Sequence, residues 1–225
     1  MTMKKMMAAL SFGAAFLSGA SSDAPARLQA AADVFKEVMG IPDKAIPQDL
    51  LNKSQCVVIV PGLKKGAFIV GAEYGKGFVT CRSKSRIGWG APASVRIEGG
   101  SFGFQAGGSE TDVIMLVMNE SGMHRLLSSK FTLGADATVA AGPVGRSTQA
   151  ETDAFMTAEI LTWSRARGLF AGVALAGATL REDLDWNNEL YGRKITNREI
   201  LTSTIAAPPP ARPLLDNLNR YSSRK

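Results

Sequence analysis

Few residues in this chain of 225 have the types and spacing that catalysis or metal binding requires. His124 is the single histidine, and Cys56 and Cys81 are the two cysteines, so no zinc-ligand spacing is present. Asp183 and Asp185 stand two residues apart within a predicted helix and therefore point in different directions. No nucleophile turn or phosphate-cradling glycine loop is found. The sequence predicts a protein that is not an enzyme and that uses no cofactor and no metal.

Basic residues form the one pattern with a functional mechanism. Residues 53–98 contain eight lysines and arginines against two glutamates. Such cations attract anionic lipid, and arginine adds a forked donor that suits phosphate. The alternative is a solvated strand edge, where lysine discourages edge pairing. The candidate lipid-binding residues are Lys64, Lys65, Lys76, Arg82, Lys84 and Arg86.

The overall charge gives less support for a nucleic-acid partner than its value indicates. The formal net charge is +6, but Lys4 and Lys5 lie in the first 20 residues and the tail carries four further cations against one aspartate. The remaining body is close to neutral. We therefore expect an anionic lipid or membrane surface as partner, with a protein partner as an alternative and no nucleic acid.

The N-terminus has the features of a secretory signal peptide. Lys4 and Lys5 precede an apolar run that ends near residue 17, and small residues follow. The run is shorter than the roughly 20 residues of a membrane span. We predict a signal peptide over residues 1–20, with cleavage after Ala20 or, as a second choice, Ala26. An exported protein, periplasmic or secreted and peripherally membrane-associated, follows from this prediction.

The mature chain predicts an α+β fold. A helix is expected over residues 25–39, and a curved or barrel-like, mostly antiparallel sheet of about eight strands follows, with helices at both ends. The folded domain is predicted over residues 25–205. Residues 206–225, which contain the run Pro208-Pro209-Pro210, are expected to form a flexible tail.

The cysteines could form a disulfide after export. However, apolar and turn residues predict three strands between them, with the first ending at Pro61-Gly62. In a three-stranded meander the first and third strands run parallel, so Cys56 and Cys81 lie at opposite ends. That separation exceeds the roughly 7 Å limit for a bridge. We expect two free, buried cysteines.

Several motifs, in this order, resemble the SYLF-domain family. They are IPQDLL at 46–51, CVVIVPGLKKG at 56–66, WGAPA at 89–93, GFQAG at 103–107, TDV at 111–113, GAD at 134–136, AGPVGR at 141–146, WSR at 163–165, RGLFAGV at 167–173, YG at 191–192 and IL at 200–201. The resemblance implies binding of phosphoinositide-like headgroups without catalysis, and export for a bacterial member. It also implies actin binding in some eukaryotic relatives, so a structural or protein-interaction module of the cell envelope is the alternative function. Ala72 and Glu73 depart from the family, which often has a further glycine there.

Overall fold

The computed structural model describes residues 23–41, 45–67, 70–83, 87–102, 107–145, 157–166, 169–173 and 175–222, with the side chains at 67, 70, 71, 100–102, 107 and 108 excepted. The predicted signal peptide, Lys84 and Arg86 lie outside the described residues. No helix within the described ranges is long and apolar enough to cross a bilayer.

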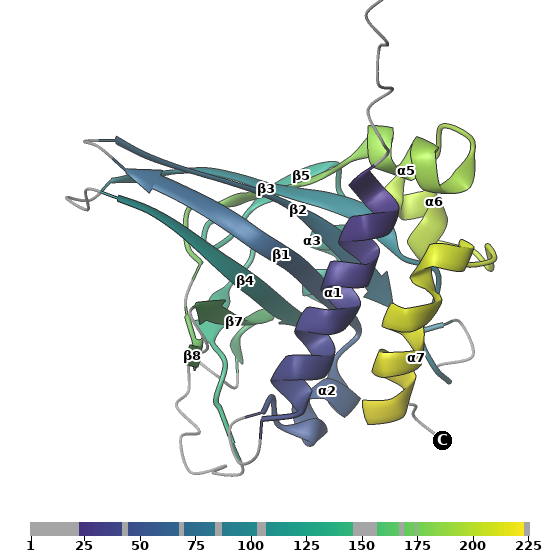
Figure 1. Ribbon diagram of the computed structural model, residues 1–225, viewed down its shortest axis with the longest axis horizontal. Helices are drawn as coiled ribbons and strands as arrows, with labels where there is room; N and C mark the ends of the chain where they lie inside the picture. The colour runs from purple at the N-terminus through teal and green to yellow at the C-terminus, as the bar shows by residue number, and fades with distance from the viewer. Residues whose placement is uncertain are drawn as a thin grey trace, which may run out of the picture.

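A single curled sheet is the framework of the α+β fold (Figure 1), as the sequence predicts. Within the described residues it has nine strands in the order β5-β9-β3-β2-β1-β4-β7-β6, and β8 also pairs with β7. All described pairings are antiparallel except β6 with β7. The strands are β1 (Cys56–Ala67), β2 (Val70–Cys81), β3 (Ala93–Phe102), β4 (Gly107–Val117), β5 (Lys130–Thr132), β6 (Val139–Ala141), β7 (Ile160–Ala166), β8 (Leu169–Gly172) and β9 (Thr179–Glu182).

The prediction of three strands between the cysteines is wrong, because β1 and β2 form one long hairpin. The chain passes through Pro61 and Gly62 by a register shift between Val60 and Leu63, so these residues make a bulge instead of a turn. Gly62 has φ 58°, which glycine adopts at little cost, and its N–H donates to Asp112 at 2.9 Å.

The hairpin also overturns the expectation of free cysteines. Cys56 and Cys81 are direct partners in the β1–β2 register, with Cα atoms 3.9 Å apart, and they form a disulfide. Two strands instead of three bring the first and last residues of this segment to the same end of the sheet. Geometry that argued against a bridge in a meander therefore favours one here.

Apolar residues fill both faces of the sheet. One face packs against α1 (Asp23–Met39), α2 (Gln48–Lys53), α5 (Leu184–Tyr191) and α7 (Arg212–Tyr221). The other face packs against α3 (Glu120–Leu126) and α6 (Asn197–Thr202). In the strands, successive side chains alternate between these two cores, as Val57 and Val58 do. Figure 1 shows α1 and α7 side by side across the front of the sheet.

The ends of β1, β2, β3 and β4 extend beyond the helices as a four-stranded projection, at the upper left of Figure 1. We call this part, residues 64–74 and 98–111 as far as the structure describes them, the tongue. β1 and β2 lie in its centre, with β3 and β4 outside them. β9 pairs with β3 only over residues 95–98, and β7 pairs with β4 only over residues 112–117, so the neighbouring strands stop where the tongue begins.

The flexible tail predicted from residue 206 is wrong for the segment that ends at Tyr221. Pro209–Ala211 form a 3-10 turn and α7 follows it, with Leu214 and Leu218 buried against α1. Pro213 stands in the first turn of α7, where proline costs no hydrogen bond. The proline run thus leads into a helix that completes the core.

Candidate functional site

Arg82 is buried, which removes it from any exposed lipid-binding surface. Its side chain follows Cys81 at the base of the β1–β2 hairpin and is 9% exposed. The guanidinium donates to the carbonyl oxygens of Leu51 and Ser222 and stacks on the Trp89 ring, 3.8 Å from its centre. Trp89 Nε1 donates to the same Ser222 carbonyl at 3.0 Å. Arg82 therefore fastens the C-terminal end of α7 to the sheet.

Lys76 is also engaged within the fold. Its ammonium lies 2.8 Å from the carboxylate of Asp183 and 4.3 Å from the centre of the Trp186 ring. Asp183 is buried and accepts a hydrogen bond from Trp186 N, so it caps α5. This lysine neutralises a buried carboxylate and leaves little charge for an external ligand.

The two remaining described candidates lie in the tongue on opposite faces. Lys65 pairs with Glu73 at 3.1 Å across the hairpin. Lys64 is exposed and forms no ion pair with any residue that the structure describes. Lys64 pairs in register with Tyr74 of β2. Arg82 follows Tyr74 by eight residues of extended chain, so about 26 Å separates Lys64 from Arg82. The structure thus does not gather the predicted cations that it describes on one surface.

A different set of side chains is exposed on the helix-side face of the tongue. Glu98, Tyr74, Lys64 and Glu110 are successive partners across β3, β2, β1 and β4, and we call them the outer row. Four adjacent strands span about 14 Å. Tyr74 is 47% exposed, an unusual state for an aromatic residue on a sheet. Of the two acids, Glu98 is bound by Arg96 and Arg181 at 2.6 and 3.0 Å.

An ion-pair group marks the boundary between the outer row and the body. Arg165 of β7 pairs with Asp112 of β4 at 2.7 Å and with Glu37 of α1. Burial of Arg165 opposes its charge, but the hydrogen bonds to Glu37 and Asp112 outweigh burial and raise its pKa. The group ties α1 to two strands, and its one cation and two carboxylates leave no free cation there.

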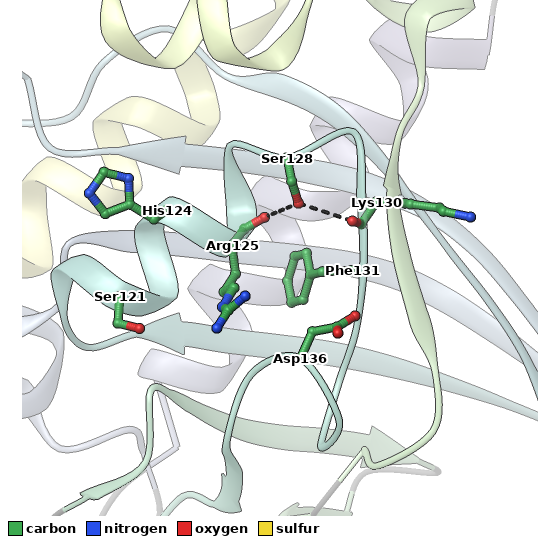
Figure 2. Close-up of a pocket in the computed structure, with 7 residues that line it drawn as sticks. All are labelled: Ser121, His124, Arg125, Ser128, Lys130, Phe131 and Asp136. Atoms are coloured by element: carbon green, nitrogen blue, oxygen red, sulfur yellow. Dashed lines mark hydrogen bonds between the residues drawn. The ribbon is translucent and has the colours of Figure 1, made fainter.

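A pocket of about 650 Å³ lies between α3 and β5, on the side of the sheet opposite α1. Ser121, His124, Arg125, Ser128, Lys130, Phe131 and Asp136 line it (Figure 2). Phe131 is buried and closes its floor. Arg125 and Asp136 lie on either side of the Phe131 ring in Figure 2, whereas the Lys130 ammonium points away from both. His124, which the sequence left without a role, stands at the rim.

Within the described residues no group of three His, Cys, Asp or Glu side chains could hold a metal ion. Asp183 is buried as a helix cap, whereas Asp185 lies in the first turn of α5. The acid pair noted in the sequence therefore does not share one site.

Comparison with known proteins assigns the chain to a family. Residues 98–221, more than half of the chain, match the family described as "Ysc84: Las17-binding protein actin regulator". The chain belongs to the Ysc84 family. Its domain is the SYLF domain, so the resemblance drawn from the motifs is confirmed.

Three of the similar proteins come from eukaryotes and are longer than this chain. The "SH3 domain-containing YSC84-like protein 1" of Xenopus laevis is 32% identical over 86% of this chain and 59% of its own length. "Protein YSC84" of Saccharomyces cerevisiae is 31% identical over 77% of this chain and 37% of its own length. "LAS seventeen-binding protein 3" from the same yeast is 31% identical over 76% of this chain. The chain thus spans between about a third and three fifths of the first two relatives.

Two features of this Ysc84-family chain escaped prediction from the sequence. The outer row depends on the register of a hairpin that was predicted as three shorter strands. The pocket joins residues of α3 with the turn after β5, and the only sequence signal was the concentration of polar residues between 119 and 136. Residues 74, 76 and 78 of β2 lie on one face of the strand, because side chains alternate along it. This spacing could have shown that Tyr74, which is exposed, shares a face with Phe78, which is buried.

Proposed function

We propose that this Ysc84-family chain is a non-catalytic binding module that contacts another protein through the outer row of the tongue. The observation that carries the proposal is the exposure of Tyr74 beside Lys64 on a projecting sheet. Tyrosine is enriched among the residues that dominate binding energy at protein interfaces. A central tyrosine flanked by charges of both signs fits a folded protein surface.

The charge distribution favours a protein over an anionic membrane. Attraction to a membrane needs several unneutralised cations on one surface, each contributing about 1 kcal/mol. Lys65, Lys76 and Arg96 each pair with a carboxylate, and Arg82 is buried. Lys64 forms no ion pair with a described residue, but Glu110 stands beside it on β4 as its register partner and brings a negative charge to the same surface. The tongue offers a mixed surface, which is selective for a partner with a complementary charge pattern.

The names of the relatives support the same class of function. The family is described as Las17-binding and actin-regulating, and one yeast relative is named for binding LAS seventeen. Because this chain spans only part of those proteins, their partners are carried to it as a proposal. An actin filament is the first protein to test.

We also propose export, with the cell envelope as the site of action. The Cys56–Cys81 disulfide supports an oxidising compartment, because such bonds are rare in reducing cytosol. The charged, apolar and small-residue order of residues 1–20 supports it independently. In that setting the partner in the cell is an envelope protein, and the actin filament serves as a test surface taken from the family description.

Anionic lipid, including phosphoinositide-like headgroups, is the second candidate ligand. Lys64 favours it, because this exposed lysine has no ion-pair partner among the described residues. Attraction to lipid would need further cations, which Lys84 and Arg86 would have to supply. A lipid surface contacted in this way responds to net charge and little to the tyrosine.

Co-sedimentation separates the two candidates. The mature chain and the Tyr74→Ala and Lys64→Gln variants are spun with actin filaments, with anionic vesicles and with neutral vesicles. The proposal predicts pelleting with filaments that Tyr74→Ala reduces by about tenfold in affinity, the effect of a strong interface residue. Lys36→Gln, on the exposed side of α1, is the matched charge control. Pelleting with anionic vesicles alone, reduced by Lys64→Gln and unchanged by Tyr74→Ala, would support the lipid candidate instead.

A further inference from the structure

The pocket between α3 and β5 contains two opposite charges that do not neutralise each other. Arg125 and Asp136 both line the pocket, yet neither forms an ion pair with any described residue. Figure 2 shows their charged ends on opposite sides of the buried Phe131 ring. Two such groups facing one space leave room for a ligand that carries both signs.

The Asp136 carboxylate and the main chain at Arg125 are held by local hydrogen bonds, whereas the Arg125 side chain is exposed. Asp136 follows Gly134, whose φ of 80° makes the tight turn, and its carboxylate accepts the Thr132 N–H at 2.7 Å. Its own N–H donates to Thr132 O at 2.8 Å. Arg125 lies in the last turn of α3, and its carbonyl accepts the Ser128 hydroxyl. A site built on fixed elements loses less entropy when a ligand binds.

Of the other polar side chains of the pocket, His124 lies farther from the Phe131 ring than Arg125 does (Figure 2), and the two serines and Lys130 have less to offer a ligand. The Ser128 hydroxyl proton is directed at the carbonyls of Arg125 and Lys130, and the Ser121 hydroxyl donates to Glu159. A hydroxyl has one proton to donate, so these serines remain as acceptors only. The Lys130 ammonium points away from Arg125 (Figure 2). Arg125 is therefore the donor, and Asp136 the acceptor, that face the space over Phe131.

We propose that this pocket binds a small zwitterion that carries a phosphate group and a primary ammonium. The phosphate accepts two hydrogen bonds from the guanidinium fork of Arg125, and the ammonium donates to the Asp136 carboxylate. The proposal is independent of the protein contact by the tongue, because the pocket lies on the other side of the sheet.

The surroundings of the pocket select against a purely anionic ligand. Glu120 and Glu159 stand beside Ser121 at the α3 side of the pocket. An anionic membrane laid over this face would meet these carboxylates as well as Arg125. A ligand whose ammonium offsets part of the phosphate charge meets less of that repulsion.

Phosphoethanolamine, inorganic phosphate and ethanolamine are the probes. Each is titrated into the 15N-labelled mature chain, and the Thr132 amide, which donates to Asp136, is followed by NMR. We expect saturable shifts with phosphoethanolamine, affinity at least about fivefold weaker for phosphate, and no shift with ethanolamine. Equal affinity for phosphate and phosphoethanolamine, or no saturable shift with phosphoethanolamine, would overturn the proposal.

Two variants separate the charges without disturbing the fold. Arg125→Gln should weaken phosphoethanolamine binding by about tenfold, the effect of losing a charged hydrogen-bond donor. Asp136→Asn keeps an oxygen for the Thr132 N–H, and it should remove the preference for phosphoethanolamine over phosphate. Lys36→Gln on α1 should change neither. Retention of the preference in Asp136→Asn would contradict the assigned role of the carboxylate.

The same group could come from a soluble ester or from a lipid headgroup. Phosphatidylcholine vesicles with and without phosphatidylethanolamine are therefore used as competitors of phosphoethanolamine. Competition only by vesicles with phosphatidylethanolamine identifies a membrane source, and absence of competition identifies a soluble one. If vesicles of phosphatidylcholine competed as strongly as vesicles that also contain phosphatidylethanolamine, the pocket would not recognise a primary ammonium, and the proposal would be contradicted.

Discussion

The two ends of the β1–β2 hairpin share a backbone arrangement and differ in almost everything else. At the base, Ile59 lies opposite Phe78, both are buried, and the Cys56–Cys81 disulfide joins the strands. In the tongue, Gly66 lies opposite Ala72 and Lys64 opposite Tyr74, with no helix over them. Folding energy is concentrated at the base, and the tongue is held in place by strand pairing.

This difference indicates which residues are not constrained by core packing and are therefore available for binding. Residues at the base are constrained by packing in two cores, so their substitution should change stability. The outer row contributes little to either core, so its substitution should change binding alone. The same strand, β2, thus carries a structural end and a contact end.

The largest expected effect contrasts two aromatic residues on one face of β2. Phe78→Ala should lower the free energy of unfolding by about 4 kcal/mol, because it leaves a cavity beside Trp186. Tyr74→Ala should change it by less than about 0.5 kcal/mol, because the side chain is half exposed. Urea unfolding measures both. Similar losses in the two variants would show that the tongue is part of the cooperative core.

Arg82→Ala should cost about 3 kcal/mol, the range seen when a buried charged group with several hydrogen bonds is removed. The carbonyls of Leu51 and Ser222 would each lose a donor. Lys64→Ala on the neighbouring strand is the comparison, and it should leave stability within about 0.5 kcal/mol. In a chain without residues 206–225 the carbonyl of Ser222 is already absent, so Arg82→Ala should cost less stability there. An unchanged cost would contradict the contact between Arg82 and Ser222.

The double variant Cys56→Ala/Cys81→Ala should lower stability by about 2–3 kcal/mol. The disulfide closes a loop of 25 residues, and opening it restores entropy to the unfolded chain. Urea unfolding with and without reductant checks this, and binding by the tongue should survive. A wild-type protein whose unfolding is insensitive to reductant would show that the cysteines are free.

The smallest expected effect lies far from the hairpin, at the start of α6. Glu199 accepts hydrogen bonds from the backbone and side chain of Thr196, which lower its pKa. A pKa that is lower in the folded than in the unfolded state stabilises the protein at pH values above the unfolded-state pKa. This stabilisation is lost as the pH falls through the pKa of the folded state. The stability difference between wild type and Glu199→Gln should therefore shrink in acid. If the stability difference between the two proteins stayed constant from pH 7 to pH 3, the hydrogen bonds from Thr196 to the Glu199 carboxylate would not be its cause.

Local sequence patterns predicted much of the fold. The helix expected over residues 25–39 is α1, and the expected antiparallel curled sheet is present. The errors came from residues with two local meanings. Pro61-Gly62 forms a bulge where a turn was expected, and Pro208-Pro209-Pro210 leads into a helix where a tail was expected.

The candidate site was less predictable, because it depends on long-range contacts. Arg82 has the same local context as an exposed loop arginine, and its partner Ser222 is 140 residues away. Lys76 is neutralised by Asp183, which lies more than 100 residues further along the chain. Composition shows how many cations a segment has, and only the tertiary structure shows which of them are already paired.

A photo-reactive residue at position 74 tests the central claim most directly. The full chain is expressed with this residue at position 74 or, as a control, at the exposed position 36 on α1, and is irradiated in the envelope of the cell. The account predicts one protein adduct of defined mass at position 74, absent at position 36 and lost when Lys64→Glu is added. Adducts with lipid alone at position 74, or the same adducts at both positions, would contradict it.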